Sequence, residues 1–307
     1  MAKPDRETEG VLKTLAQVKP LTSGDPDISV VRQAYDEVFA AWTAPTLKPT
    51  QERWTQAASP ESRPCLVIEP AQASNNPFTL VFIHGGGWSL GTAISYAPLG
   101  RWLCAKTGMR VLVPDFPQAP EEPAPAARLA LERTLSWAAE KFGDPVILAG
   151  DSAGGNLAAV LANHPPQYVS IAAQVLLYPV LDLRPDASYP SRRKYGRGRH
   201  FLTEAAILGA AMQYCGESES PASPLLSPIL ETDFSHTPQT VLLVSELDPL
   251  LDECLAYADQ LKQRGLSVDV IIARRTIHGF GSFCGRISSG RKALESACDF
   301  LMKICSS

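Results

Sequence analysis

The sequence lacks the features that mark a membrane-spanning, secreted or nucleic-acid-binding protein. It contains no run of about 18 apolar residues, and its first twenty residues carry charges without the apolar stretch of a signal peptide. An excess of positive charge is also missing, because 28 Lys and Arg against 32 Asp and Glu leave a net charge of −4. We therefore expect no membrane span, no signal peptide and no nucleic-acid partner.

Paired cysteine motifs are absent too. The seven cysteines are scattered, their number is odd, and no two form a CxxC pair. Neither a disulfide framework nor a zinc site is therefore expected. We assign no residue as a metal ligand. We interpret the cysteines as reduced thiols of a cytoplasmic protein: Cys65, Cys104, Cys215, Cys254, Cys284, Cys298 and Cys305.

What the sequence does contain is an alternation of apolar and helix-like segments. Apolar runs rich in β-branched residues indicate strands that are buried on both faces of a parallel sheet: 66–70, 79–85, 109–116, 145–152, 170–180, 240–247 and 267–275. Helix-length stretches lie between several of them: 95–108, 125–142, 156–163, 251–264 and 291–304. This alternation is typical of a doubly wound α/β fold, and we expect a single domain over residues 1–307.

Two segments interrupt the alternation. Residues 1 to about 50 carry apolar positions at helical spacing, and residues 184 to about 221 form an insertion with a helical centre, "LTEAAILGAAMQYC". Ligands of such sheets bind at the carboxyl ends of the strands, where inserted segments can cover them. We therefore predict that these two segments form a cap.

The run "VILAGDSAGGNLAAVL" places a serine between a predicted strand and a predicted helix. Gly150, Ser152 and Gly154 match G-x-S-x-G, in which a sharp turn holds a nucleophilic hydroxyl clear of its neighbours. Taken alone, the run also fits a tight turn in which Ser152 only caps the helix. A phosphate-binding loop fits poorly, since neither glycine-rich phosphate motif is matched. Ser152 is thus a candidate nucleophile.

A glycine run earlier in the chain offers hydrogen-bond donors for such a serine. In "FIHGGGWSLG", which follows a predicted strand, three glycines leave backbone amides free to stabilise an oxyanion. Three consecutive glycines are also compatible with a flexible loop that has no catalytic role. The donors are assigned as the following backbone N–H groups: Gly86, Gly87 and Ala153, with Gly85 able to replace one of them. His84 is expected to shape the loop, and Trp88 to line the substrate pocket.

The sequence contains five histidines as candidates for the base. His278 fits best, because it follows the last predicted strand, in "TIHGFG". In enzymes with the G-x-S-x-G turn, the serine comes first in the chain, the acid second and the histidine last. The acid must orient the imidazole, and Asp248 stands at a strand-to-loop junction, in "SELDPLLDE". Glu246 is the reserve candidate, whereas Asp252 resembles a charge at a helix N-terminus.

With these motifs in order, the chain resembles the hormone-sensitive-lipase-like esterases of the α/β-hydrolase fold. The resemblance covers residues 79 to about 283 and rests on "HGGGW", "GDSAGG", "DPLLDE" and "IHGF", with "APEEPAPAA" between the first two. It implies a mostly parallel eight-stranded sheet with helices on both faces and a helical cap. It also implies hydrolysis of short-chain carboxylic esters without a cofactor, and frequent dimers. Carried over by position, it assigns a triad and oxyanion donors: Ser152, Asp248 and His278, with Gly86, Gly87 and Ala153.

Two stretches depart from that family. The chain has "DFPQ" at 115–118 where the family usually has Asp-Tyr-Arg, so the arginine is missing. The insertion also carries a basic stretch, which we interpret as a solvated, mobile cap loop, with contact to an anionic substrate or to an acidic carrier partner as the alternative: Arg192, Arg193, Lys194, Arg197 and Arg199.

The sequence therefore predicts a serine hydrolase that cleaves carboxylic esters through an acyl-enzyme. An amidase, a deacetylase or a lactonase would use the same triad, since these enzymes differ in the leaving group. A small-molecule binding protein without catalysis is the alternative from another class, and the three filled triad positions count against it. The expected partner is a small ester substrate, and a homodimer is one option for the assembly.

Overall fold

A computed structural model of the chain describes residues 2–19, 21, 27–43, 45, 48–57, 59, 62–72, 74, 76–143 and 145–304. Cys305 and parts of the predicted cap segment 1–50 lie outside the described residues. The six cysteines within them are buried free thiols.

Within the described residues, eight strands form one sheet in the order β1-β2-β4-β3-β5-β6-β7-β8. The strands are β1 Thr50–Gln56, β2 Pro64–Pro70, β3 Thr79–Ile83, β4 Arg110–Pro114, β5 Val146–Asp151, β6 Ile171–Leu177, β7 Gln239–Ser245 and β8 Val268–Ala273. β2 runs antiparallel to both of its neighbours, and the other neighbouring pairs are parallel. The mostly parallel α/β sheet that the sequence predicts is confirmed.

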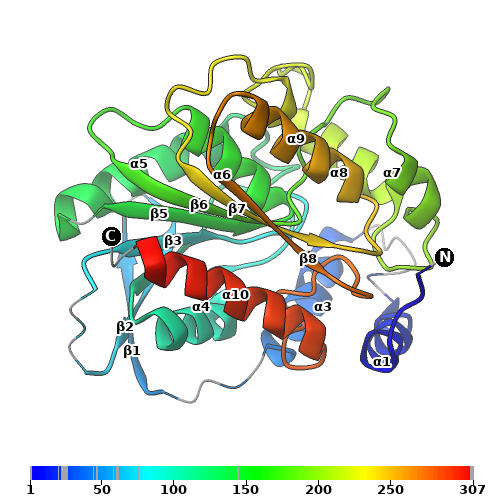
Figure 1. Ribbon diagram of the computed structural model, residues 1–307, viewed down its shortest axis with the longest axis horizontal. Coiled ribbons are helices and arrows are strands. Elements are labelled where there is room, and N and C mark those ends of the chain that lie inside the picture. The colour runs from blue at the N-terminus through cyan, green and yellow to red at the C-terminus, as the bar shows by residue number, and fades with distance from the viewer. Residues whose placement is uncertain are drawn as a thin grey trace.

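Helices cover both faces of the sheet, which gives three layers (Figure 1). One face carries α4 Ala93–Thr107 and α10 Ser288–Ile304, and the other carries α5 Ala126–Phe142, α6 Ala153–Asn163 and α9 Leu251–Gln263. Because side chains alternate along a strand, Leu80 and Phe82 of β3 face the first layer, whereas Val81 and Ile83 face the second. Burial on both faces explains why the central strands are apolar throughout.

One strand has no counterpart among the predicted apolar runs. β1 has the sequence TQERWTQ, lies at the sheet edge and is largely exposed. It pairs with β2 through its backbone, so its side chains can remain polar. A smaller difference concerns α6, which begins at Ala153, three residues before the predicted start at Asn156. None of the helices in the described ranges is both long and apolar enough to cross a membrane.

The two segments outside the alternation contribute helices near the end of the sheet where the parallel strands terminate (Figure 1). Segment 1–50 includes α1 Arg6–Leu15 and α3 Ile28–Ala41, and the insertion includes α7 Pro190–Tyr195 and α8 Glu204–Cys215. This placement is the one that a cap requires. The cap itself stays a prediction.

The basic stretch of the insertion departs in part from the solvated loop that we expected, because its first residues are helical and one of its side chains is buried. Arg192 lies in α7 with only 1% of its surface exposed, and it forms an ion pair with Glu253 of α9 at 2.6 Å. The other basic side chains of the stretch are exposed. A buried guanidinium needs a partner, and this partner is 61 residues away in the chain. The local charge pattern therefore could not distinguish Arg192 from its neighbours.

Candidate active site

Ser152 stands at a sharp turn between β5 and α6. Its backbone has φ 54° and ψ −117°, a combination that non-glycine residues rarely adopt. The turn is tight, because a Cβ at Gly150 would come within 2.4 Å of the Gly154 carbonyl oxygen, and one at Gly154 within 2.1 Å of the Ile83 carbonyl oxygen. The two glycines of G-x-S-x-G permit this approach, which leaves the serine at the N-terminal end of α6.

The structure brings the three predicted triad side chains into contact in series. The His278 Nε2 lies 2.9 Å from the Ser152 Oγ, and the His278 Nδ1 lies 2.8 Å from the Asp248 Oδ2. Asp248 and His278 are buried, and the other oxygen of Asp248 accepts the Leu250 N–H at 2.9 Å. An imidazole held in this way can take the serine proton through Nε2 while the carboxylate stabilises the imidazolium.

In the glycine loop after β3, one backbone amide donates a hydrogen bond within the protein and others do not. The Gly85 N–H donates to the Asp151 Oδ1 at 2.7 Å, so it is not available to an oxyanion. The amides of Gly86, Gly87 and Ala153 donate to no group in the part of the chain that the structure describes. These three amides remain the candidate oxyanion donors.

Side chains from outside the glycine loop hold it in place. Arg32 of α3 donates from Nε to the Ser89 carbonyl oxygen at 2.8 Å, and Gln118 donates from Nε2 to the Gly91 carbonyl oxygen at 2.7 Å. The His84 ring stacks on Phe116 with 4.4 Å between centroids. Gln118 and Phe116 both belong to "DFPQ", so the stretch that departs from the family pattern packs against the loop.

Asp151 is a candidate functional residue that the sequence reasoning missed. It is fully buried, and its two oxygens accept the Gly85 N–H at 2.7 Å and the Tyr96 hydroxyl at 3.1 Å. Burial raises the pKa of this carboxyl to about 6, although the hydrogen bonds act in the opposite direction. The available signal was the acidic residue at the end of an apolar strand, because a buried carboxyl requires partners.

A cavity of about 430 Å³ lies beside Ser152 and His278. Both predicted cap segments line it, α3 through Val31 and Tyr35 and α8 through Ile207 and Ala210. Trp88 also lines the cavity, as the sequence suggested, and stacks on Tyr214 with 4.6 Å between ring centroids. Apolar walls with a few convergent polar groups are typical of small-molecule sites.

The remaining acidic candidates have other partners. Glu246 accepts the backbone N–H of Arg275 at 2.7 Å, and Asp252 accepts the backbone N–H of Ser191 at 2.7 Å. His278 is paired with Asp248 instead. Among the described residues, no three His, Cys, Asp or Glu side chains are grouped as metal ligands.

Comparisons with known proteins extend these observations. The family described as alpha/beta hydrolase fold matches residues 80–282. The chain is 38% identical over 215 residues to the carboxylic ester hydrolase LipN of Mycobacterium tuberculosis, which covers 66% of this chain and 56% of LipN. It is 30% identical over 301 residues to carboxylesterase NlhH of the same organism, which covers 92% of this chain and 91% of NlhH.

A solved structure gives the same fold. The hyperthermophilic esterase from the archaeon Pyrobaculum calidifontis superposes with a TM-score of 0.85 at 27% sequence identity, and 100% of both chains is covered. The chain spans little more than half the length of LipN, but nearly the whole length of NlhH.

Proposed function

Because the chain belongs to the hormone-sensitive-lipase-like carboxylesterase family of the α/β-hydrolase fold, we propose that it is a serine hydrolase that cleaves carboxylic esters. The observation that supports this most directly is the series of contacts from the Ser152 Oγ through His278 to Asp248, beside an apolar cavity. LipN and NlhH are ester hydrolases by name, which agrees with the chemistry of this arrangement.

The reaction proceeds in two halves. In the first, the Ser152 Oγ attacks the ester carbonyl carbon while the His278 Nε2 takes the hydroxyl proton. The bond to the alcohol oxygen then breaks, the alcohol leaves with that proton, and the acyl group remains on Ser152. In the second half, water attacks the acyl carbon, His278 takes a proton from the water and returns it to Ser152, and the carboxylic acid departs. One ester and one water give one acid and one alcohol.

Two groups stabilise charge during these steps. The amides of Gly86, Gly87 and Ala153 donate to the oxygen on which negative charge develops, and Asp248 holds the imidazole in the tautomer whose Nε2 is free to accept a proton. Fixed backbone dipoles lose little energy to reorganisation at the moment of reaction. Catalysis therefore depends on the rigidity of the glycine loop and of the turn at Ser152.

The cavity supports short-chain esters as the substrate class. A volume of about 430 Å³ with mostly apolar walls suits short acyl chains, and the described lining residues include no acidic or basic residue other than Asp151 and His278. Parallel assays with p-nitrophenyl esters, an anilide and a lactone would separate an esterase from an amidase or lactonase. Turnover of the anilide above that of the esters would contradict the proposal.

Replacement of the nucleophile tests the proposed function. We expect Ser152→Ala to lower the kcat for p-nitrophenyl acetate by about 10³-fold or more and to abolish labelling by a fluorophosphonate probe, because the attacking atom is gone. Ser296→Ala, which removes an exposed hydroxyl on α10, is the matched control and should keep full activity. Undiminished turnover by Ser152→Ala would exclude this serine as the nucleophile.

We also propose that the protein is a cytoplasmic homodimer. The scattered cysteines, six of which are buried free thiols, support a cytoplasmic location, which fractionation of the source cells would test. Family membership supports a homodimer, and a monomer mass from light scattering of the purified protein would contradict it.

A further inference from the structure

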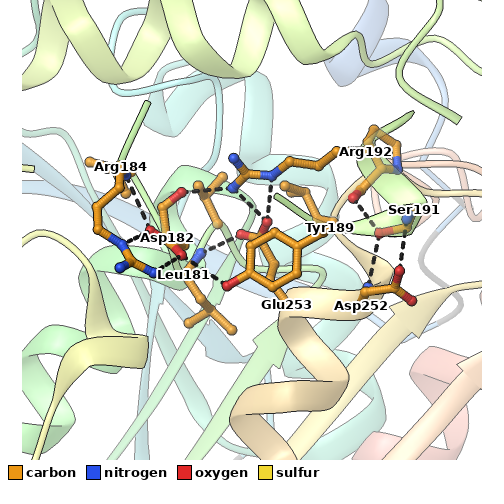
Figure 2. Close-up of polar contacts among 12 residues, drawn as sticks. Leu181, Asp182, Arg184, Tyr189, Ser191, Arg192, Asp252 and Glu253 are labelled. Atoms are coloured by element: carbon orange, nitrogen blue, oxygen red, sulfur yellow. Dashed lines mark hydrogen bonds and ion pairs between the residues drawn. The ribbon is translucent and has the colours of Figure 1, made fainter. Parts of the chain in front are cut away.

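A largely buried polar cluster joins α7 of the insertion to the start of α9 (Figure 2). We name it the α7–α9 cluster and define it by six residues: Asp182, Tyr189, Ser191, Arg192, Asp252 and Glu253. It includes none of the residues that contact the cavity, so a role in substrate binding does not account for it. Two sets of contacts build it, one between helix ends and one between charges.

The first set caps two helices reciprocally. Neither α7 nor α9 has a side-chain hydrogen bond from its own N-cap residue. Instead, the Asp252 Oδ2 accepts the Ser191 N–H at 2.7 Å, and the Ser191 Oγ accepts the Asp252 N–H at 3.1 Å. The orphan amides at each helix start are thus satisfied by the other helix, which ties the two starts together.

Ser191 also reaches the residue next to the proposed catalytic acid. Its Oγ donates to the Pro249 carbonyl oxygen at 2.7 Å. The Asp248 carboxylate takes its orientation from the same short stretch, because its Oδ1 accepts the Leu250 N–H at 2.9 Å. The hydroxyl of Ser191 therefore holds the backbone that aims Asp248 at His278.

The second set is a buried ion pair. Arg192 donates from Nε and Nη2 to the Glu253 Oε2 at 2.9 and 2.6 Å, and Nη2 also donates to the Asp182 carbonyl oxygen at 2.7 Å. The Glu253 Oε1 accepts the Leu181 N–H at 2.8 Å. Burial raises the pKa of the Glu253 carboxyl, and Arg192 acts in the opposite direction. Such a pair adds little net stability over apolar packing, so orientation is the better account of it.

The ion pair connects both ends of the candidate triad. The Leu181–Asp182 backbone follows β6, and its neighbour Val180 donates its N–H to the Ser152 carbonyl oxygen at 3.2 Å. Glu253 lies on α9, directly after the loop of Asp248. Arg192 and Glu253 therefore connect the segment beside the nucleophile with the segment that carries the acid.

We propose that Ser191 and Arg192 are positioning residues, which act through the α7–α9 cluster to keep the Asp248 carboxylate against His278. The proposal rests on the proposed function, because an aligned acid matters only if His278 acts as a base. Displacement of a catalytic group by about 1 Å can cost 10²-fold in rate, so a shift of the loop affects kcat more than KM. The insertion then serves the chemical step as well as covering the site.

The test compares two buried serines of the same type. Ser191→Ala removes the hydroxyl that bridges Pro249 and Asp252, and Ser227→Ala removes one that bridges the Pro221 carbonyl oxygen at 2.6 Å and the Leu183 N–H at 2.8 Å. Both serines are buried, and each variant loses one donated and one accepted hydrogen bond, so similar falls in melting temperature are expected.

We expect Ser191→Ala to lower kcat for p-nitrophenyl acetate by about tenfold or more, with KM changed by less than about twofold. The rate of fluorophosphonate labelling at Ser152 should fall by the same factor, because it reports activation of the nucleophile. Ser227→Ala should keep both rates within about twofold of the wild type. Equal losses in the two variants, or a normal kcat in Ser191→Ala, would overturn the positioning role.

A second variant, Arg192→Lys, tests the positioning role with a conservative change that keeps the buried positive charge. Arg192→Lys retains the charge, but an ammonium cannot reproduce the guanidinium fork towards Glu253 and the Asp182 carbonyl oxygen. It should lower kcat at unchanged KM, whereas Arg193→Lys on the same helix, where the side chain contacts Ser188, should not. If the wild type neither turns over esters nor labels at Ser152, the proposed function itself fails. If it does both and these variants match it, only the positioning role fails.

Discussion

Asp151, the residue directly before the candidate nucleophile, shows how one buried group can link stability and activity. Its carboxyl holds the glycine loop through the Gly85 N–H and reaches α3 through Tyr96, whose hydroxyl lies 2.8 Å from that of Tyr35. Burial raises its pKa from 3.8 to about 6, so the folded protein binds this proton more tightly than the unfolded chain does. The charge state of one residue therefore affects the loop that carries the candidate oxyanion donors.

This shift predicts a pH dependence of stability. The carboxyl contributes fully to the free energy of unfolding below about pH 4, and this contribution is lost as the pH rises through about 6. Relative to Asp151→Asn, which cannot ionise, we expect the wild type to lose about 3 kcal/mol between these pH values. Urea unfolding of both proteins at several pH values measures the difference. Parallel pH dependences would contradict the prediction.

At the scale of elements, the strand-turn-helix unit β5–Ser152–α6 depends on close backbone approach. Gly154 lies where α6 passes the end of β3, and a Cβ there would meet two carbonyl oxygens, those of Ile83 at 2.1 Å and His84 at 2.4 Å. Neither oxygen belongs to a flexible side chain, so the helix would have to move. The geometry at Ser152 is thus set by the packing of a helix on two strands.

A pair of glycine substitutions tests this dependence. We expect Gly154→Ala to lower the free energy of unfolding by about 3 kcal/mol or more, through overpacking of backbone against backbone. Gly10→Ala in α1, where a Cβ meets nothing within 4 Å, should raise it by up to about 1 kcal/mol through helix propensity. Thermal or urea unfolding gives both values. A neutral Gly154→Ala would show that the turn can relax.

At the scale of the whole molecule, the cavity is shared by distant parts of the chain. Tyr35 of α3 lines it from the N-terminal segment, Ile207 of α8 from the insertion, and His278 from the loop after β8. The proposed catalytic groups lie on the α/β core, whereas much of the apolar wall belongs to the two predicted cap segments. We therefore expect acyl-chain preference and chemistry to be determined by different regions.

This division predicts a specificity change without loss of the triad. Ile207→Ala should enlarge the cavity and raise kcat/KM for p-nitrophenyl octanoate relative to the acetate by about fivefold or more, because each added methylene gains apolar contact. Ile229→Ala, which shortens a partly buried isoleucine outside the cavity lining, should leave that ratio unchanged. An unchanged ratio in Ile207→Ala would mean that acyl chains do not contact α8.

Local patterns were sufficient where the structure depends on neighbours in sequence. The apolar runs predicted the seven strands from β2 to β8, because a strand that is buried on both faces is a continuous apolar run in the sequence. β1 was not predicted, because an edge strand that pairs through its backbone can have polar side chains and then forms no apolar run. The start of α6 and the burial of Arg192 were not predicted for a related reason, because each depends on a contact with residues outside the local sequence window.

The sequence by itself determined the class of fold and the candidate set for the site, because strand burial and turn glycines leave a signal within a few residues. Only the tertiary structure decided that the Gly85 amide is used by Asp151, that Arg192 is buried against Glu253, and that α3 and α8 share one cavity. Each of these is a contact between side chains or amides far apart in the chain. Such contacts form only when the whole molecule packs, and they leave no pattern among neighbouring residues from which they could be predicted.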